Sequence, residues 1–285
     1  MPKLSTSYSL RRDEVVGPGL IRVLKTMAEN ARNLSGRPVS QLPDSIHDLR
    51  TLIKRLRAIL WFDRPVLGKV RYKQSNGVLC KAAARLSQAR DLVAVQLALT
   101  KAAMPETNEE HLRSLVRVSQ AFARKEAERK KSDEASLSPL KKAVGDVVPV
   151  IEQTIRVAKD RKVPSPRQRI KKAFRVARKA RKKALRENQL PLVHEWRKKS
   201  KRLFYLLQLT KNLPGTGMAG CLEKVDKLQE TLGEFQDGVV AENHLRRHPP
   251  DVDATDLDRT IRLLKKKRKL LLNSTLSHSL PTFPL

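Results

Sequence analysis

A short pattern of histidine, arginine and lysine occurs twice in this chain. Residues 45–58 read SIHDLRTLIKRLRA, and residues 192–205 read LVHEWRKKSKRLFY. Counting from either histidine, basic residues recur at positions +3, +7 and +8. On a helix, positions 0, +3 and +7 lie on one face, about one turn apart. Each copy therefore predicts a stripe of cationic side chains, which suits a repeating anion better than a single reacting atom.

The basic residues of the two copies are candidates for binding that anion. The first copy supplies His47, Arg50, Lys54 and Arg55, and the second supplies His194, Arg197, Lys201 and Arg202. Arginine offers a fork of donors to phosphate oxygens, and lysine offers a point charge. The two histidines have two interpretations: each donates to an anion when protonated, or each makes a structural hydrogen bond to a neighbouring helix.

Similarity between the two halves extends beyond this motif. His47 and His194 are 147 positions apart, and the same shift pairs Arg22 with Arg169 and Lys25 with Lys172. A shift of 146 pairs further positions downstream: Leu86 with Leu232, Asp91 with Asp237, and Val93 with Val239. Blocks that recur in the same order predict an internal repeat. We expect one helical bundle over residues 1–137 and a second over 138–285, with the linker near 129–142.

The composition predicts a folded protein with an acidic partner. The chain has 285 residues, 40% of them hydrophobic, and its 60 Lys and Arg against 29 Asp and Glu give a formal net charge of +31. Both halves are basic, so self-repulsion disfavours the compact state unless a polyanion offsets it. We find neither an apolar run of about 18 residues nor a secretory signal, and we expect no membrane segment.

Apolar residues recur at helical spacing nearly throughout, and the pattern gives no hairpin signal. We therefore predict an all-α fold. Pro43-Asp44 before the first motif, and Asn212 to Gly215 after the second, mark helix boundaries. The expected helices cover about 14–33, 44–62, 67–87, 89–103, 106–132, 138–160, 166–188, 192–212, 218–235, 237–247 and 254–276.

The segment 161–186 is the most basic part of the chain. It contains 13 Lys and Arg and no Asp or Glu. Ile170, Phe174 and a series of alanines still form a narrow apolar stripe, so we expect one packed face and a broad cationic remainder. Lys172 and Arg175 of this segment join Arg22, Lys25 and Arg169 as further candidates for anion binding.

The remaining reactive residue types indicate structure. Cys80 and Cys221 have neither metal-ligand nor redox-motif spacing, and we expect both to be reduced and buried. Trp61 and Trp196 are expected in the core. Asp91 and Asp237 are expected to cap helices or to pair with cations of the motif helices. No metal site or cofactor is predicted, because no carboxylate pair has suitable spacing.

The two H-x-x-R-x-x-x-K-R helices, each followed by an L-x-x-x-[RQ]-D segment, resemble the CHAD family. The resemblance extends over about residues 14–275. It implies two four-helix bundles related by internal duplication, with a basic channel between them that binds inorganic polyphosphate. It also adds Arg57 from the first copy and Lys198 from the second to the candidate residues. The copies differ at two corresponding positions: Thr51 corresponds to Lys198, and Arg57 corresponds to Phe204. The binding face is therefore not symmetric.

Three other functions compete with non-catalytic polyphosphate binding. The charge would attract nucleic acid non-specifically, although aromatic residues make up only 4% of the chain and do not interleave with the basic stripes. An enzyme acting on phosphoanhydrides would need carboxylates for Mg²⁺ or a nucleophile with its base, and neither arrangement is found, so we expect no catalysis. A scaffold for granule assembly is compatible with polyphosphate binding.

The expected location follows from the expected ligand. We expect a cytoplasmic protein associated with polyphosphate granules. Lys265 to Lys269 would serve as a nuclear signal in a eukaryote, although lysine runs on helices are usually solvated faces. The sequence leaves the oligomeric state open.

Overall fold

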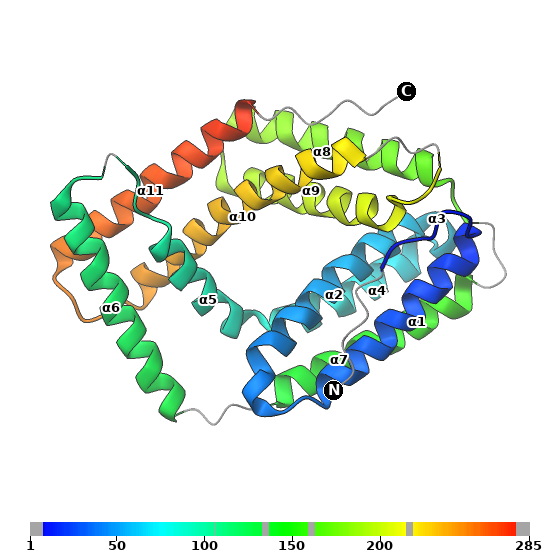
Figure 1. Ribbon diagram of the computed structural model, residues 1–285, viewed down its shortest axis with the longest axis horizontal. Helices are drawn as coiled ribbons and strands as arrows, with labels where there is room; N and C mark the ends of the chain where they lie inside the picture. The colour runs from blue at the N-terminus through cyan, green and yellow to red at the C-terminus, as the bar shows by residue number, and fades with distance from the viewer. Residues whose placement is uncertain (1–7, 106, 133–136, 159–162, 215–218, 278–285) are drawn as a thin grey trace. The chain divides into compact units, whose positions relative to one another are not determined.

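The computed structural model describes residues 8–105, 107–132, 137–158, 163–214 and 219–277 (Figure 1). Within these residues all regular secondary structure is helical, which confirms the predicted all-α fold. The helices are α1 (Val16–Ser35), η1 (Val39–Gln41), α2 (Leu42–Phe62), α3 (Arg64–Leu67), α4 (Lys69–Arg85), α5 (Ser87–Thr100), α6 (Glu109–Ser132), α7 (Ser138–Ala158), α8 (Pro166–Glu187), α9 (Leu190–Thr210), α10 (Ala219–Arg247) and α11 (Ala254–Ser277).

Local signals set the ends of the helices that carry the candidate residues. α2, α8 and α9 each have a proline in their first turn, where its missing N–H is not needed. The Ser165 side chain caps α8 by accepting a hydrogen bond from the backbone N–H of Gln168 at 3.5 Å. Asn188, with a φ of 45°, ends α8 in the left-handed conformation. A short connection then leads from Asn188 to the start of α9.

The chain divides into two compact units. The first unit contains α1 to α4, α7 to α9 and the part of α10 that ends at Gln229. The second unit contains α5, α6, α11 and the part of α10 that begins at Glu230. Each unit therefore draws helices from both halves of the sequence. A compact unit and a sequence repeat are different divisions of a chain, and the bundles over 1–137 and 138–285 stay a prediction.

Helices of the first half of the sequence recur in the second half at a nearly constant difference in residue number. α2 begins at Leu42 and α9 at Leu190, 148 positions later. α6 begins at Glu109 and α11 at Ala254, 145 positions later. In the same order, α1 corresponds to α8, and α4 with α5 corresponds to α10. An internal repeat would leave such a recurrence, and the repeat itself stays a prediction.

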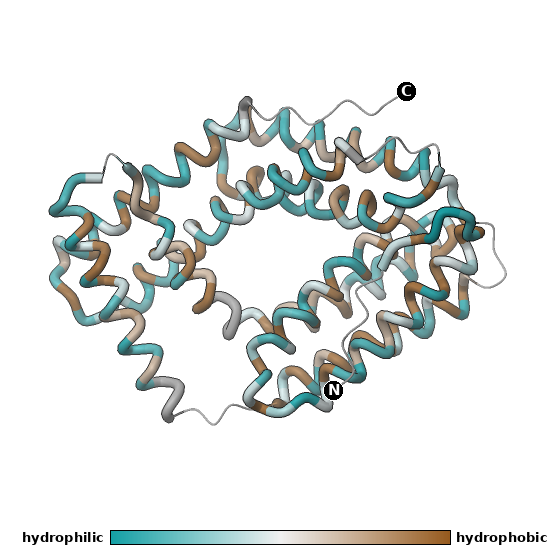
Figure 2. Tube along the Cα trace, viewed as in Figure 1, coloured by the Kyte–Doolittle hydropathy of each residue, from teal (hydrophilic) through white to brown (hydrophobic). Residues whose placement is uncertain are grey.

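In the first unit, α2 lies among α1, α4, α7 and α9. The apolar residues that recur at helical spacing on α2 are mostly buried: Leu49, Ile53, Leu56 and Leu60 are each at most 1% exposed, and Ile46 is half-buried. Figure 2 shows apolar and polar residues alternating along these helices, as amphipathic packing requires. The buried stripe fixes the rotation of α2 about its axis. It thereby determines the direction in which the basic stripe points.

The helix α9 is anchored in the same unit by α8 and α2. Trp196 is fully buried and Trp61 is 6% exposed, which confirms that both tryptophans belong to the core. Ser200, which stands where the first copy has Ile53, is also fully buried. Trp196 is the largest fully buried side chain of α9, so it contributes most to holding the second basic stripe in place.

The second unit has its own core. It is built from α5, α6, the second part of α10 and α11, with α6 packed against α5 and α11. Val95, Leu99, Phe122 and Leu245 are buried there. The Phe122 ring meets the His244 ring edge-on, with centroids 5.6 Å apart. The buried residues of this core are distinct from the candidate anion-binding residues.

Three details differ from the sequence predictions. Residues 218–235 and 237–247 were expected as two helices, but α10 is continuous, because the packing of α11 on it outweighs the cost of Gly233 and Gly238. A separate short helix, α3, precedes α4, and Gly68 with a φ of 78° makes the turn between them. The prediction for Cys80 was wrong: it is exposed, whereas Cys221 is buried.

No described helix combines the length and the apolar character that crossing a membrane requires.

Candidate functional site

Both predicted basic stripes lie in the first unit, on helices that pack against each other. They comprise His47, Arg50 and Lys54 on α2, and His194, Arg197 and Lys201 on α9. His47 is exposed and the other five side chains are half-buried. In Figure 1, α2 and α9 approach each other at their carboxyl ends and separate towards their amino ends. The structure thus brings the two copies of the motif into one compact unit.

Two arginines of the first copy are held by α4. The guanidinium of Arg50 donates to the backbone oxygen of Ala83 at 3.0 Å, and Arg57 Nε donates to Asn76 Oδ1 at 2.9 Å. Both acceptors are neutral. A guanidinium has five N–H donors, so a bond of this kind orients the side chain and does not neutralise its charge. Arg50 and Arg57 are therefore positioned cations.

Lys198 of the second copy is engaged differently. Its ammonium group forms an ion pair with Glu195, and Lys199 lies 3.3 Å from the same carboxylate. Burial alone would raise the pKa of Glu195, but the hydrogen bonds and charges of the two lysines outweigh it and lower that pKa. The Glu195 carboxylate, which Lys198 shares with Lys199, thus neutralises part of the positive charge of Lys198 within its own helix. Of the residues of the second copy, it is the least suited to an external anion.

Arg22 is also partnered within the protein. Its guanidinium forms a two-pronged ion pair with Glu14, with both N–O distances 2.7 Å, and donates to the backbone oxygen of Ser9 at 3.0 Å. A Cβ at Gly19 would lie 2.7 Å from the Glu14 carboxylate, so the glycine makes room for this pair. The neighbouring candidate Lys25 is exposed. Arg22 therefore ties residues 9–14 to α1.

The Arg22–Glu14 pair predicts a pH dependence of stability. The hydrogen bond from Arg22 lowers the pKa of Glu14 from 4.5 to about 2. The stabilisation is present above the unfolded pKa near 4.5 and is lost as pH falls from there through the folded value. We expect Glu14→Gln to lower the free energy of unfolding by about 1 kcal/mol at pH 7, since the pair is partly solvated. Urea denaturation from pH 7 to pH 3 should show the two proteins converging.

The matched control for this change is Glu29→Gln, which alters an exposed carboxylate on α1, the helix that carries Arg22. It should leave stability nearly unchanged. A Glu14→Gln variant as stable as the parent at pH 7 would contradict the assignment of the ion pair.

Arg55 lies between two tyrosines. Its guanidinium carbon is 4.6 Å from the Tyr8 ring centroid and 5.9 Å from that of Tyr205. Burial raises the pKa of Tyr205, while the positive charges of Arg55 and Arg197 oppose that rise. A small cavity of about 110 Å³ beside them is also lined by Lys211. The first and second copies of the motif therefore meet around Tyr205.

A third group of candidates gathers at the carboxyl end of α2. We call it the arginine cluster; its members are Arg57, Arg64, Arg169 and Arg202. The guanidinium carbons of Arg169 and Arg202 lie 4.3 and 5.0 Å from the Trp61 ring centroid, and that of Arg64 lies 5.3 Å from the Tyr72 ring centroid. Arg169 also donates to the backbone oxygen of Trp61.

Arg64 and Tyr72 were missed by the sequence analysis. Arg64 stands just beyond the end of the motif helix and belongs to no repeated block. The only signal in the sequence was its place three residues after Trp61, within W-F-D-R-P.

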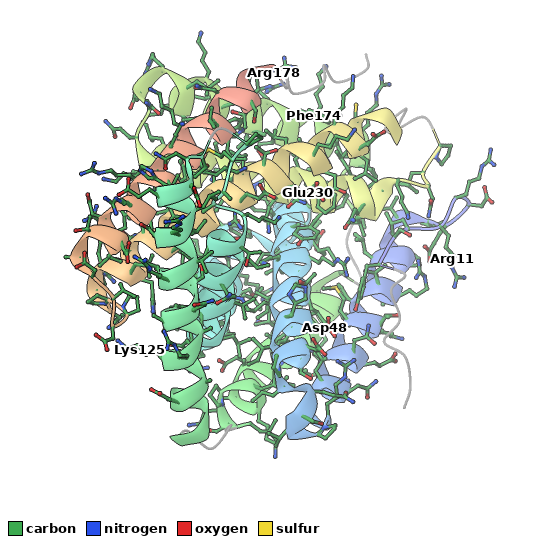
Figure 3. The ribbon with its side chains drawn as sticks, turned by 60° about the vertical axis from the view of Figure 1, so that its left-hand side comes forward. Arg11, Asp48, Lys125, Phe174, Arg178 and Glu230 are labelled. Atoms are coloured by element: carbon green, nitrogen blue, oxygen red, sulfur yellow. The ribbon has the colours of Figure 1, made fainter. Side chains whose placement is uncertain are left out.

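The remaining candidates of α8 lie on its solvent side. Lys172 and Arg175 are exposed, and Arg181 is half-buried. Figure 3 labels Phe174 and Arg178 on this helix; Phe174 is 3% exposed and Arg178 is exposed. The narrow apolar stripe and broad cationic remainder expected of this segment are therefore confirmed. Lys172 and Arg175 add to the positive field of the unit.

The aspartates of the two repeats are less informative. The side chain of Asp91 lies outside the described residues. Asp237 is half-buried in the second unit, where its charge, together with that of Glu234, helps to raise the pKa of Lys101. Within the described residues, no three His, Cys, Asp or Glu side chains gather as a metal site requires.

Comparison with known proteins adds a family to this geometry. The model of the CHAD domain matches residues 21–246. A similar solved structure is the crystal structure of the CHAD domain from the plant Ricinus communis, with a TM-score of 0.60 and 16% sequence identity over 97% of this chain and 92% of that chain. At this identity, the likeness concerns the fold alone. No curated protein matches the chain. Because the family model covers more than half of the sequence, this protein belongs to the CHAD domain family.

Proposed function

We propose that this protein binds inorganic polyphosphate and does not hydrolyse it. The observation that supports this most is the pair of basic stripes on α2 and α9, which present the same residue types in the same order within one compact unit. Adjacent helical turns are about 5.4 Å apart, a spacing at which successive cations can meet nearby phosphates. A polymer with roughly one charge per phosphate and no bases suits such rows.

Electrostatics supports the same ligand class. Arg57 is oriented by a neutral acceptor, and this hydrogen bond leaves its charge in place for an anion. Much of the affinity would come from the release of counterions and would fall as salt rises. A polyphosphate ligand would also bring the protein to polyphosphate granules in the cytoplasm.

Nucleic acid is the competing ligand, because a charge of +31 attracts any polyanion. Single-strand recognition relies on exposed aromatic rings that stack on bases. Trp61 and Trp196 are both buried and offer no such platform. The burial of both tryptophans therefore weighs against stacking of single-strand bases on them and favours polyphosphate.

A calorimetric titration tests the proposal. The protein would be titrated with long-chain polyphosphate at about 0.15 M salt, and then with triphosphate and duplex DNA. We expect saturable binding of the long chain and much weaker responses to the other two. Comparable binding of DNA would mean that net charge alone explains the association. Timed incubation with polyphosphate, with and without Mg²⁺, should leave the chain length unchanged, and shortening would contradict non-catalytic binding.

One arginine from each stripe is expected to contribute more to the affinity for polyphosphate than its charge alone would. We expect the double variant Arg50→Ala/Arg197→Ala to bind long-chain polyphosphate about ten- to a hundredfold more weakly, because two charge-assisted contacts are lost. The slope of log K against log salt should become less steep by about 1.4–1.8, since two cationic contacts are removed. Arg50→Lys/Arg197→Lys should lose less, since the charges remain and only the forked donors are lost. Titration calorimetry over a salt series measures both quantities.

The matched control is Arg124→Ala/Arg156→Ala. It removes the same charge from two exposed arginines outside the stripes, and it should change the affinity little. Circular dichroism would show whether each variant keeps its helices. Equal losses in the two double variants would mean that the stripes have no special role.

A further inference from the structure

The arginine cluster differs in shape from the stripes. Its four members come from four helices: Arg57 from α2, Arg64 from α3, Arg169 from α8 and Arg202 from α9. They surround the carboxyl end of α2, where Trp61 lies. A stripe presents cations in a row along one axis, whereas these arginines come from separate helices, and two of them place their guanidinium groups over the same Trp61 ring.

Aromatic rings hold three of the four arginines without neutralising them. Arg169 and Arg202 lie over Trp61, and Arg64 lies over Tyr72. A ring face attracts a cation through its quadrupole and leaves the net charge in place. Among the residues that the structure describes, none of the four arginines forms an ion pair with a carboxylate. The arginines of the cluster are therefore oriented, and no ion pair with a described carboxylate neutralises their charges.

The arginines also repel one another. Burial first, and then the charges of Arg64 and Arg202, lower the pKa of Arg169. Burial also lowers the pKa of Arg202, and the charges of Arg57 and Arg64 lower it further. Two carboxylates act on the cluster: the charge of Asp63, which is 2% exposed, acts on Arg169, and that of Glu195 acts on Arg202. Two carboxylates against four guanidinium groups leave a net positive site that an anion would relieve.

We propose that the arginine cluster binds the terminal phosphate of a polyphosphate chain. This inference rests on the proposed function and adds to it the recognition of a chain end. The stripes on α2 and α9 then bind the internal phosphates.

The chemistry of a chain end favours this assignment. An internal phosphate of the polymer carries one negative charge and two oxygens outside the chain. A terminal phosphate has three such oxygens and a second ionisable group with a pKa near 6, by analogy with phosphate monoesters. Forked guanidinium donors from several directions match the group with more oxygens and more charge. Arg64 is exposed and Arg57 and Arg202 are half-buried, so the outer members of the cluster can reach a ligand.

The test compares two polyphosphates of the same length, one with free ends and one with both ends blocked as phosphoramidates. Calorimetry would measure the affinity of the full-length protein, Arg64→Ala, Arg64→Lys and the control Arg71→Ala, which removes an exposed arginine of α4. We expect the parent to bind the free-ended chain about tenfold more tightly than the blocked chain. Arg64→Ala should abolish this preference, Arg64→Lys should reduce it, and Arg71→Ala should keep it.

The outcomes separate this inference from the proposed function. Equal binding of the two chains by the parent would overturn end recognition and leave polyphosphate binding intact. Equal weakening of both chains in Arg64→Ala would also overturn it, because the cluster would then act on internal phosphates. Failure of the parent to bind either chain would refute both the inference and the proposed function.

Discussion

Replacing Trp196 with alanine is expected to destabilise the first unit by about 3–5 kcal/mol, the usual cost of removing a large aromatic side chain from a core. Trp196 is fully buried on α9, one position before Arg197. The substitution removes apolar contacts and leaves a cavity between α9 and its neighbours. Because native domains have only about 5–15 kcal/mol of stability, the variant should be close to unfolding at physiological temperature.

Urea denaturation followed by circular dichroism measures this effect. Leu190→Ala is the matched control, since Leu190 is on the same helix and 47% exposed. It should change the free energy of unfolding by less than about 0.5 kcal/mol. A loss below about 1 kcal/mol for Trp196→Ala would show that α9 does not depend on its buried tryptophan.

A substitution at Asp63 is expected to have an effect of the opposite sign. Burial raises the pKa of this carboxyl group to about 6, although the charge of Arg169 opposes the rise. The charged form is therefore disfavoured in the folded protein. A difference between about 6 and the unfolded value of 3.8 corresponds to an upper bound of about 3 kcal/mol. We expect Asp63→Asn to stabilise the protein at pH 7 by an amount that approaches this bound.

The pH dependence identifies the cause. The destabilisation by Asp63 is complete above pH 6, shrinks as pH falls from about 6 to 3.8, and is absent below that value. The advantage of Asp63→Asn should shrink in the same window and vanish near pH 3.5. Urea denaturation of both proteins between pH 3.5 and pH 8, without phosphate, measures it. A variant that is less stable than the parent at pH 7 would mean that attraction to Arg169 outweighs burial.

The sequence predicted the fold class and the stripes because each depends on helical periodicity. The apolar positions of α2 recur every three or four residues, and this pattern also fixes where His47, Arg50 and Lys54 lie on the helix. The burial of both tryptophans followed from the same periodicity. Local patterning determined these features, and the structure preserved them.

Features that depend on contacts between distant segments could not be predicted. The arginine cluster requires α8 and α9 to meet the end of α2, and no spacing in the sequence encodes that meeting. The pairing of Arg22 with Glu14 depends on how residues 9–14 fold back on α1. Cys80 lies in an apolar stretch, but it occupies the solvent side of α4, so its exposure escaped a prediction based on composition. The continuity of α10 depends on packing by α11.

The uncompensated arginines also bear on how much folded protein a cell would keep. Mutual repulsion among four guanidinium groups lowers the free energy of unfolding, and a ligand that binds only the folded chain raises it by RT ln(1 + [L]/Kd). Under the proposed function, the folded fraction would follow the supply of the polyanion. Chains made when the polyanion is scarce would open more often and meet proteases sooner. Abundance of the protein would then be set partly by its own ligand, without any change in synthesis.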